Sequence, residues 1–263
     1  MWRCKMKKPL QIEFESENVK CYLAGEVAVL KITCNAFGTL TNLDQANRVL
    51  PWFDMVENDP SVKAIVGMSE KDCLGETAYE EFLSEITGRS IQRDKYNEIT
   101  RFEKSDIRAI EINMLINLIR KIYSFKKIFI SAINGEIVTP FLGLSLVSDF
   151  RFASSDLKIM FSHVKYGLHP SGAIPFFLPK FINKQLAMKY MLQGGVINFE
   201  EAGKLNLVNE LVDDSEFEKN SIEKAKGYIK MGMSTLKNTK SLINSNSDEL
   251  ENYFKIESNY TYK

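Results

Sequence analysis

The chain has 263 residues, with 34 Lys and Arg balanced by 34 Asp and Glu, so no net charge favours nucleic acid or an anionic membrane. Its hydrophobic content of 44% is typical of globular proteins, and its length suits one large domain or a core with a helical extension. No apolar run approaches the ~20 residues of a membrane span, and none follows the basic N-terminus, so we expect a cytoplasmic protein without a signal peptide.

The cysteines do not indicate a disulfide framework or a metal site. They are few, widely separated and without paired ligand spacing: Cys4, Cys21, Cys34 and Cys73. We therefore predict reduced thiols and no bound metal.

The first third of the chain predicts short strands followed by a helix. Alternation of apolar and polar residues indicates strands at 10–16, 19–24 and 26–33. Residues 42–59 have helical spacing, and Pro51 is expected to kink this helix or to start a second short one. Residues 61–69 read as a buried strand.

The middle third combines a polar segment with a clear helix. Residues 75–106 are charged and weakly periodic, which predicts a mobile, partly helical surface segment. Residues 105–125 form an amphipathic pattern, and residues 127–135 predict the next strand. A turn and a short apolar helix should then precede a strand at 149–157.

That turn lies in the stretch INGEIVTPFLGLSLVSD, residues 133–149. A strand that runs into a helix start commonly presents backbone N–H groups to an anion. Here Pro140 has no N–H to offer. We predict Thr139 as the N-cap and Pro140 as the first helical residue.

The C-terminal part predicts helices. They are expected at 183–194, 198–206, within 214–245 and at 247–258. Asn198 is a predicted N-cap, with Glu201 at the spacing of a capping box. Strand and helix units followed by helices predict an α/β fold, with a core at 1–200 and a helical region at 201–263.

Several phrases, in this order, resemble the crotonase family, the enoyl-CoA hydratase/isomerase superfamily. They are DPSVKAIVGMS, KIFISAINGEI, SDFRFASSDLKI, VKYGLHPSGAIPFFLPKFI, QLAMKYMLQGGVINFEEAGKLNLVNELV and STLKNTKSLI. The resemblance implies a ClpP/crotonase spiral of ββα units and a C-terminal helical trimerisation region. It also implies an acyl thioester of coenzyme A or of a carrier-protein pantetheine arm as the substrate, with no permanently bound cofactor.

The family stabilises a thioester enolate with two backbone N–H groups, and the resemblance can be carried over position by position. The second oxyanion glycine falls on Pro140, followed by the bulky Phe141, and the first donor falls near Glu76. The two catalytic glutamates fall on Gly143 and His163. The basic residue that often contacts the CoA adenylate is missing from residues 34–42.

These departures argue against plain hydration. Water addition needs two acid–base groups, and neither glutamate position carries an acid. His163 is the candidate base, since imidazole titrates near neutral pH. His169 and Leu142 join Gly143 as predicted pocket residues, and Glu81 is a second, weaker catalytic candidate. Both histidines also fit ordinary loop residues bonded to the backbone.

Three functions remain open from the sequence. The first is an acyl-thioester isomerase, decarboxylase or lyase that uses His163. The second is a catalytically inactive homologue that binds a thioester or pairs with an active paralogue. The third is a C–C bond or thioester hydrolase. For all three, the resemblance implies a homotrimer or a dimer of trimers, with neither nucleic acid nor membrane as a partner.

Overall fold

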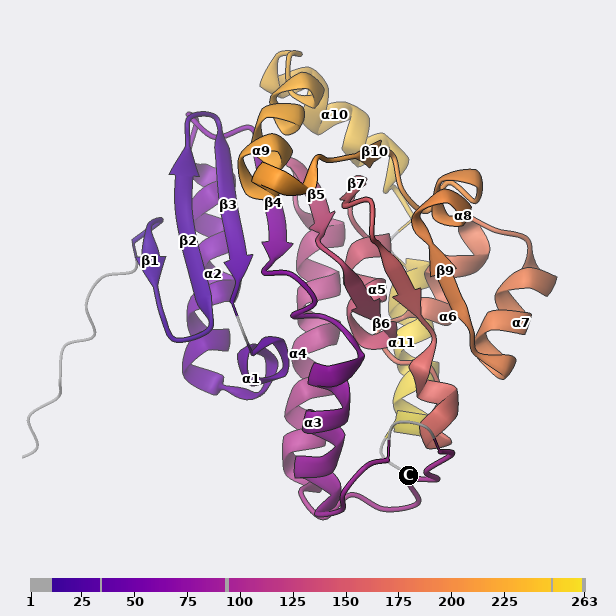
Figure 1. The fold of residues 1–263 in the computed structure, drawn as a ribbon. Coiled ribbons are helices and arrows are strands. Elements are labelled where there is room, and N and C mark those ends of the chain that lie inside the picture. The colour runs from indigo at the N-terminus through magenta and orange to yellow at the C-terminus, as the bar shows by residue number, and fades with distance from the viewer. Residues whose placement is uncertain (1–10, 34, 93–94, 247, 262–263) are drawn as a thin grey trace, which may run out of the picture.

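The computed structural model describes residues 11–33, 35–92, 95–246 and 248–261 (Figure 1). Within that part of the chain, seven strands form the main sheet in the order β1-β2-β3-β4-β5-β7-β10. They are β1 (Phe14–Glu15), β2 (Val19–Ala24), β3 (Val27–Ile32), β4 (Ala64–Ser69), β5 (Ile128–Ile133), β7 (Phe150–Ala153) and β10 (Glu210–Leu211). The first three strands pair antiparallel, and β3, β4, β5, β7 and β10 pair parallel.

A second, smaller sheet lies beyond the end of β5 (Figure 1). It consists of β6 (Glu136–Val138), β8 (Lys158–Met160) and β9 (Val196–Asn198). Strand β6 pairs parallel with β8, which pairs antiparallel with β9.

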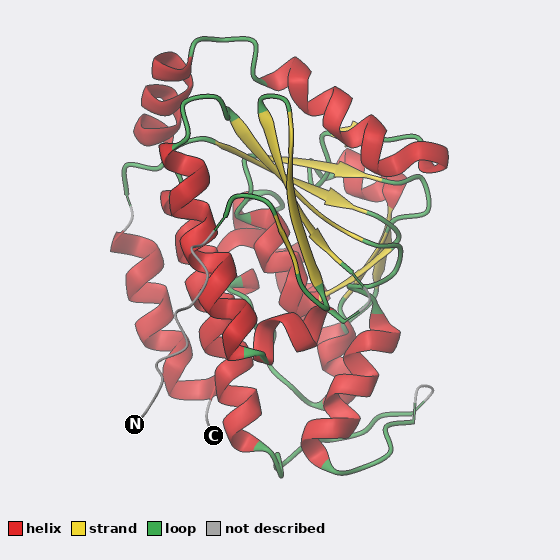
Figure 2. Ribbon diagram, turned by 90° about the vertical axis from the view of Figure 1, so that its left-hand side faces the viewer, coloured by secondary structure: helices red, strands yellow, loops and turns green. Residues whose placement is uncertain are grey.

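Helices cover both faces of the main sheet (Figure 2). The α-helices are α1 (Ala36–Thr41), α2 (Leu43–Asn58), α3 (Glu76–Thr87), α4 (Ser105–Ser124), α5 (Thr139–Leu146), α6 (Ile174–Phe177), α7 (Lys184–Gln193), α8 (Phe199–Lys204), α9 (Phe217–Tyr228), α10 (Met233–Ile243) and α11 (Asp248–Thr261). Short 3-10 helices are η1 (Ser162–Tyr166), η2 (Leu178–Lys180) and η3 (Asp214–Glu216). The larger core lies on the side of α2, α4 and α5, and the smaller core lies under α9 and α10.

Burial on both faces explains the sequence of the central strands. In β4, Ile65 belongs to the larger core and Val66 to the smaller one, and β5 alternates in the same way with Phe129 and Ile130. Consecutive positions are therefore apolar, as in parallel strands covered on both sides.

The structure refines three local predictions. Pro51 lies inside α2, so it does not start a second helix. Segment 75–106 is partly helical, as predicted, but its helix α3 buries Phe82, Leu83 and Ile86 in the core. Val138 is the N-cap of α5 and Thr139 its first residue, because β6 runs directly into the helix. Cys4 and Cys34 lie outside the described residues.

The predicted N-cap of α8 is confirmed, since the Asn198 side chain accepts a hydrogen bond of 3.0 Å from the Glu201 N–H. The Glu201 carboxylate does not complete a capping box, because it accepts a hydrogen bond from the Tyr190 hydroxyl at 2.6 Å. The local sequence therefore predicted the N-cap correctly, whereas a tertiary contact with Tyr190 engages the carboxylate of Glu201.

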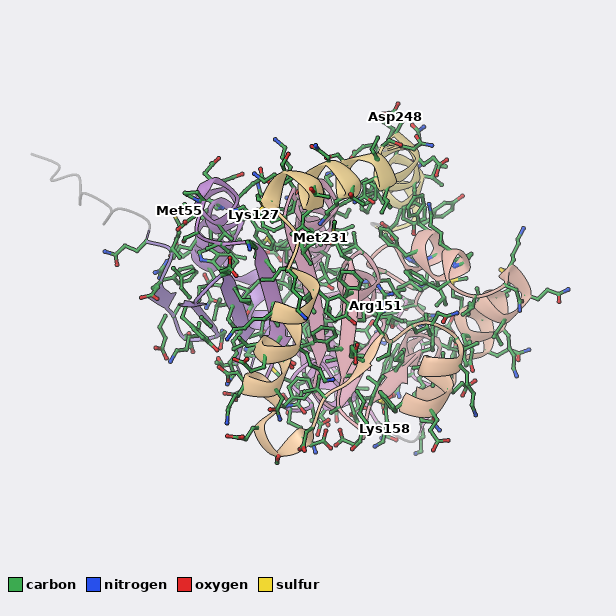
Figure 3. The ribbon with its side chains drawn as sticks, turned by 90° about the horizontal axis from the view of Figure 1, so that it is seen from above. Met55, Lys127, Arg151, Lys158, Met231 and Asp248 are labelled. Carbon is green, nitrogen blue, oxygen red and sulfur yellow. The ribbon has the colours of Figure 1, made fainter. Side chains whose placement is uncertain are left out.

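Buried cations connect distant segments. Lys240 of α10 donates to the backbone oxygen of Lys127 at 2.9 Å and to Asp149 at 2.6 Å. Arg151 donates from Nε to the Leu207 carbonyl at 2.8 Å; Lys127 and Arg151 are labelled in Figure 3. None of the described helices is long and apolar enough to cross a membrane.

Candidate functional site

Two turns that are far apart in the sequence lie side by side at the ends of β4 and β5. The first leads from β4 into α3, and the second leads from β5 through β6 into α5. They are joined by a bridge between Leu74 and Ile137 and by a hydrogen bond of 2.9 Å from the Val138 N–H to the Leu74 carbonyl. The topology thus brings the predicted positions Glu76 and Pro140 to the same edge of the fold.

Asp72 of the first turn contacts the second turn at Gly135 and Glu136. The Glu136 N–H donates to Asp72 Oδ1 at 2.9 Å. Gly135 has φ +81°, and a Cβ there would lie 2.1 Å from Asp72 Oδ1. The positive φ favours glycine, and a side chain here would also displace the Asp72 carboxylate from its contact with the Glu136 N–H.

The N-terminus of α3 faces a carboxylate of the chain itself. Glu136 Oε2 lies 3.5 Å from the Glu76 N–H, at the long end of hydrogen-bond distances. The other carboxylate oxygen of Glu136 pairs with Lys158 at 3.2 Å; Lys158 is labelled in Figure 3. The amide donor predicted near Glu76 therefore has an internal acceptor beside it.

The side chain of Glu76 is also engaged. It is buried and pairs with Lys165 of η1, with Nζ and Oε1 separated by 2.6 Å. One helical turn further on, Glu80 accepts a hydrogen bond of 3.1 Å from the Tyr166 hydroxyl. These two contacts hold α3 against η1.

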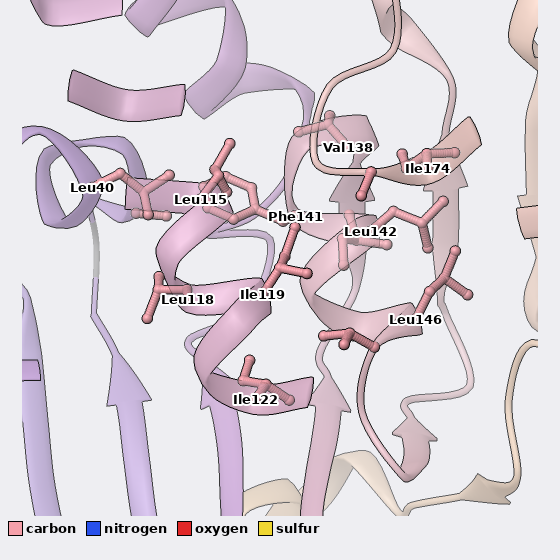
Figure 4. Close-up of a cluster of buried hydrophobic side chains, with 14 of the residues drawn as sticks. Leu40, Leu115, Leu118, Ile119, Ile122, Val138, Phe141, Leu142, Leu146 and Ile174 are labelled. Atoms are coloured by element: carbon pink, nitrogen blue, oxygen red, sulfur yellow. The ribbon is translucent and has the colours of Figure 1, made fainter. Parts of the chain in front are cut away.

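The second turn offers no N–H at Pro140, which is buried near the start of α5. The ring of Phe141 packs edge-on against Phe37, with centroids 4.8 Å apart, and is 2% exposed (Figure 4). Leu142 is likewise buried. The turn keeps its helix start and fills the adjoining space with apolar side chains.

Gly143 lies beneath the loop that precedes α6. A Cβ at Gly143 would stand 1.6 Å from the carbonyl oxygen of Gly172. A Cβ at Gly172, which has φ +74°, would stand 2.5 Å from the carbonyl oxygen of Pro140. No side chain fits at position 143 in this arrangement, and in particular no carboxylate does.

His163 is buried in η1, with 1% of its surface exposed. Its Nε2 lies 2.9 Å from the Met191 carbonyl and must donate to it, so Nδ1 is left without a hydrogen. Nδ1 has no hydrogen-bond partner among the described residues. Burial lowers the pKa of His163 to about 4, so the ring is neutral at pH 7.

The other predicted residues lie outside this cluster. His169 is exposed, and its Nδ1 lies 3.3 Å from the Pro170 carbonyl, so the two histidines make separate contacts. Glu81 lies on the exposed face of α3. The structure brings together Glu76, Pro140, Phe141 and Gly143.

Sequence reasoning missed Glu136, Lys165 and the buried ion pair of Arg108 with Glu111 on α4. For Glu136, the signal was an acidic residue directly after Gly135 in the predicted turn. Two opposite charges at i and i+3 within the apolar helix were a signal for the ion pair. No cluster of three or more metal-binding side chains occurs in the described part of the chain.

One hollow adjoins the turns, and a second lies beside η1. An apolar cavity of about 80 Å³ includes Leu74, Ile137 and Phe141 in its wall. A wider depression of about 540 Å³ is lined by Lys165, Lys95, Tyr96 and residues 193–196, among others. Lys165 thus connects the ion pair with Glu76 to the larger hollow.

Comparison with known proteins gives consistent matches. A family model described as enoyl-CoA hydratase/isomerase matches residues 35–263. A putative enoyl-CoA hydratase of Thermus thermophilus is 22% identical over 219 residues, covering 83% of this chain and 81% of the relative. A probable peroxisomal enoyl-CoA hydratase 1 of Arabidopsis thaliana is 30% identical over 141 residues, 54% of this chain, and the match spans about half (52%) of that relative.

Solved structures share the fold at low sequence identity. An enoyl-CoA hydratase from Mycobacterium avium subsp. paratuberculosis superposes with a TM-score of 0.72 and 16% identity, covering 94% of this chain and 93% of the other. One from Bacillus halodurans gives a TM-score of 0.71 and 18% identity, with 93% and 94% covered.

Proposed function

Because this chain belongs to the enoyl-CoA hydratase/isomerase family, we propose that it binds an acyl thioester without hydrating it. The relatives named above are described as a probable and a putative enoyl-CoA hydratase, which supports a thioester as the ligand. We place the thioester at the two adjoining turns, with the depression beside Lys165 and Lys95 available to the phosphates of the carrier. Lysine side chains suit phosphate because they carry a compact positive charge.

The observation that carries this proposal is the second turn. Enolate stabilisation needs two preorganised donors, and loss of one such donor typically costs ~10²–10³ in rate. Pro140 has no N–H, and Gly143 has no room for an acid because of the Gly172 carbonyl. The carboxylate of Glu136 beside the Glu76 N–H further disfavours a developing negative charge there.

A crotonyl-CoA absorbance assay tests the catalytic part, and a CoA-thioester titration by calorimetry tests the binding part. We expect saturable binding and no hydration above the rate without protein. Turnover at a rate typical of enzymes, ~1–10³ s⁻¹, would overturn the proposal. Absence of binding would overturn the thioester ligand.

The variant Lys165→Met tests where the thioester binds. It removes the charge between Glu76 and the depression, so we expect weaker binding of the thioester. Lys204→Met, at an exposed position of α8, should bind as the wild type does.

A second candidate is an isomerase, decarboxylase or lyase with His163 as the base. The observation in its favour is the neutral ring, whose Nδ1 has a free lone pair. This chemistry requires η1 to move, because the ring is buried and bonded to Met191. Turnover of an acyl-CoA followed by chromatography, and its loss in His163→Ala, would support it; an activity unchanged in that variant would contradict it.

For the assembly we propose a homotrimer or dimer of trimers formed through the region 201–263. Exposed apolar side chains on the last two helices support this: Leu242, Ile243, Ile256 and Tyr260, each more than half exposed. Sedimentation velocity would separate these states from a monomer, which would contradict the proposal.

A further inference from the structure

The apolar cavity lies between the main sheet and helices α4 and α5. Its floor is a row of paired residues across three strands, in which Gly67 of β4 lies between Leu30 of β3 and Ser131 of β5. Two of these three residues are small. The row therefore leaves a gap in side-chain volume in the middle of an otherwise bulky core.

The gap is maintained by the ring of Phe129. A Cβ at Gly67 would lie 2.8 Å from the tip of that ring, so the ring extends over the glycine. Phe129 is 5% exposed and stacks on Phe53, with centroids 5.9 Å apart. The ring therefore packs between Gly67 and Phe53 and forms part of the cavity wall.

Helices α4 and α5 form the roof. Leu118 and Ile122 of α4 are one helical turn apart, and Phe141 in the first turn of α5 lies beside them (Figure 4). Leu144 and Ser145 complete this wall. At one end the cavity reaches Leu74 and Ile137, the bridge that joins the two turns.

Ser145, besides Ser131 of the floor, is a polar residue in this otherwise apolar lining. It is 2% exposed, and its hydroxyl has no hydrogen-bond partner among the described residues. A buried polar group without a partner costs about 1–3 kcal/mol. A ligand that carries one hydrogen-bonding atom could satisfy it.

We propose that this cavity is a binding site for a short hydrocarbon group with at most one polar atom. The hydrocarbon comes either from a free small molecule or from the end of a short acyl thioester, and only the second source rests on the proposed function. The wall contacts at Leu74 and Phe141 place the cavity beside both turns.

Size and polarity support this class of ligand. The volume of about 80 Å³ is smaller than the roughly 150 Å³ of an engineered apolar cavity that takes up benzene or xenon. A buried water needs about 2–4 polar partners, and the side chains of this lining offer only the hydroxyls of Ser131 and Ser145. The cavity therefore favours an apolar occupant of a few carbon atoms over water.

Xenon is the probe, because it is apolar and needs no thioester site. Methyl NMR of the wild-type protein under xenon pressure should show saturable shifts for Leu118, Ile122 and Leu144. Ser145→Leu fills the space and should weaken xenon binding at least about tenfold, whereas Ser145→Ala should change it less than about twofold. Absence of saturable shifts in the wild type, or unchanged binding in Ser145→Leu, would overturn the proposal.

A second filling variant guards against a folding failure. If Ser145→Leu loses its dispersed methyl spectrum, Leu144→Phe should reduce xenon binding in the same way. Leu192→Phe, at an exposed position of α7, should leave it unchanged.

The source of the hydrocarbon is decided by competition. If butyryl-CoA displaces xenon and CoA does not, the acyl chain occupies the cavity. If butyryl-CoA binds without displacing xenon, or fails to bind, while xenon still binds, the ligand is a free small molecule. A failure of thioester binding is thereby separated from a failure of the cavity.

Discussion

At the scale of single residues, burial determines what the side chains of this site can do. His163 is a potential base by type, but desolvation outweighs its hydrogen bond to Met191 and keeps the ring neutral over the physiological range. Pro140 acts through its covalent structure, because it removes a donor in any environment. Glu136 acts through its position beside the Glu76 N–H.

The buried His163 should make stability depend on pH. In the unfolded chain the ring takes up a proton near its ordinary pKa of 6.5, but in the folded chain only near 4. Its contribution is thus present above pH 6.5 and is lost as the pH falls towards 4. Urea unfolding at pH 7 and pH 5 should show a loss of about 2 kcal/mol from this group.

His163→Gln should lower the unfolding free energy at pH 7 and remove most of that pH dependence. His169→Gln, which changes the other histidine, should remove less, because desolvation also lowers the pKa of His169 but the residue keeps far more contact with solvent than His163 does. Equal pH dependence in His163→Gln and the wild type would contradict the burial argument.

At the scale of elements, the contact between α5 and the loop before α6 closes the site. Gly143 and Gly172 allow two backbone segments to meet at distances that exclude a Cβ on either residue. The same contact explains why the buried start of α5 presents no catalytic side chain at this position. The helix and the loop form one packed unit.

Gly143→Ala should therefore destabilise the protein by about 1–3 kcal/mol or more, because the new methyl group overlaps the Gly172 carbonyl. Gly227→Ala is the matched control: it lies in α9 with no atom within 4 Å of a built Cβ, and should stabilise by up to about 1 kcal/mol. Urea unfolding measures both. A Gly143→Ala protein as stable as the control would show that α5 and the loop are not in tight contact.

At the scale of the whole molecule, the C-terminal helices are part of the core. Phe217, Ile222 and Leu236 from α9 and α10 bury the second face of the sheet. Helix α11 packs on α4, where Arg120 makes two hydrogen bonds to Glu251 at 2.8 and 2.7 Å. The division at residue 200 therefore stays a prediction about oligomerisation rather than a boundary between separate cores.

Lys240 should be important for this arrangement. Burial lowers its pKa and raises the pKa of Asp149, so desolvation of the pair is substantial. Lys240→Met leaves Asp149 buried without its cation and should cost about 3–5 kcal/mol, with faster amide hydrogen exchange in α10. Lys219→Met breaks an exposed pair with Glu216 and should cost less than about 1 kcal/mol. Similar losses in the two variants would contradict a structural role for Lys240.

Much of the fold followed from local patterns. The structural neighbours confirm the predicted crotonase-like α/β fold. This fold could be predicted because the alternation of apolar residues, the helical spacing and the ordered motifs are properties of the sequence itself. The continuity of α2 through Pro51 and the burial of α3 were not predicted, because tertiary packing overrides weak local signals. The catalytic and pocket roles of His163, His169 and Glu81 stay predictions.

The sequence by itself determined the family and the missing donor at Pro140, since both depend on residue identity and order. Only the tertiary structure decided that Gly172 covers Gly143, that Glu136 lies at the start of α3 and that His163 is buried. Each of these depends on segments separated by more than 20 residues meeting at a few ångströms. Such contacts follow from the packing of the whole chain, which no local pattern encodes.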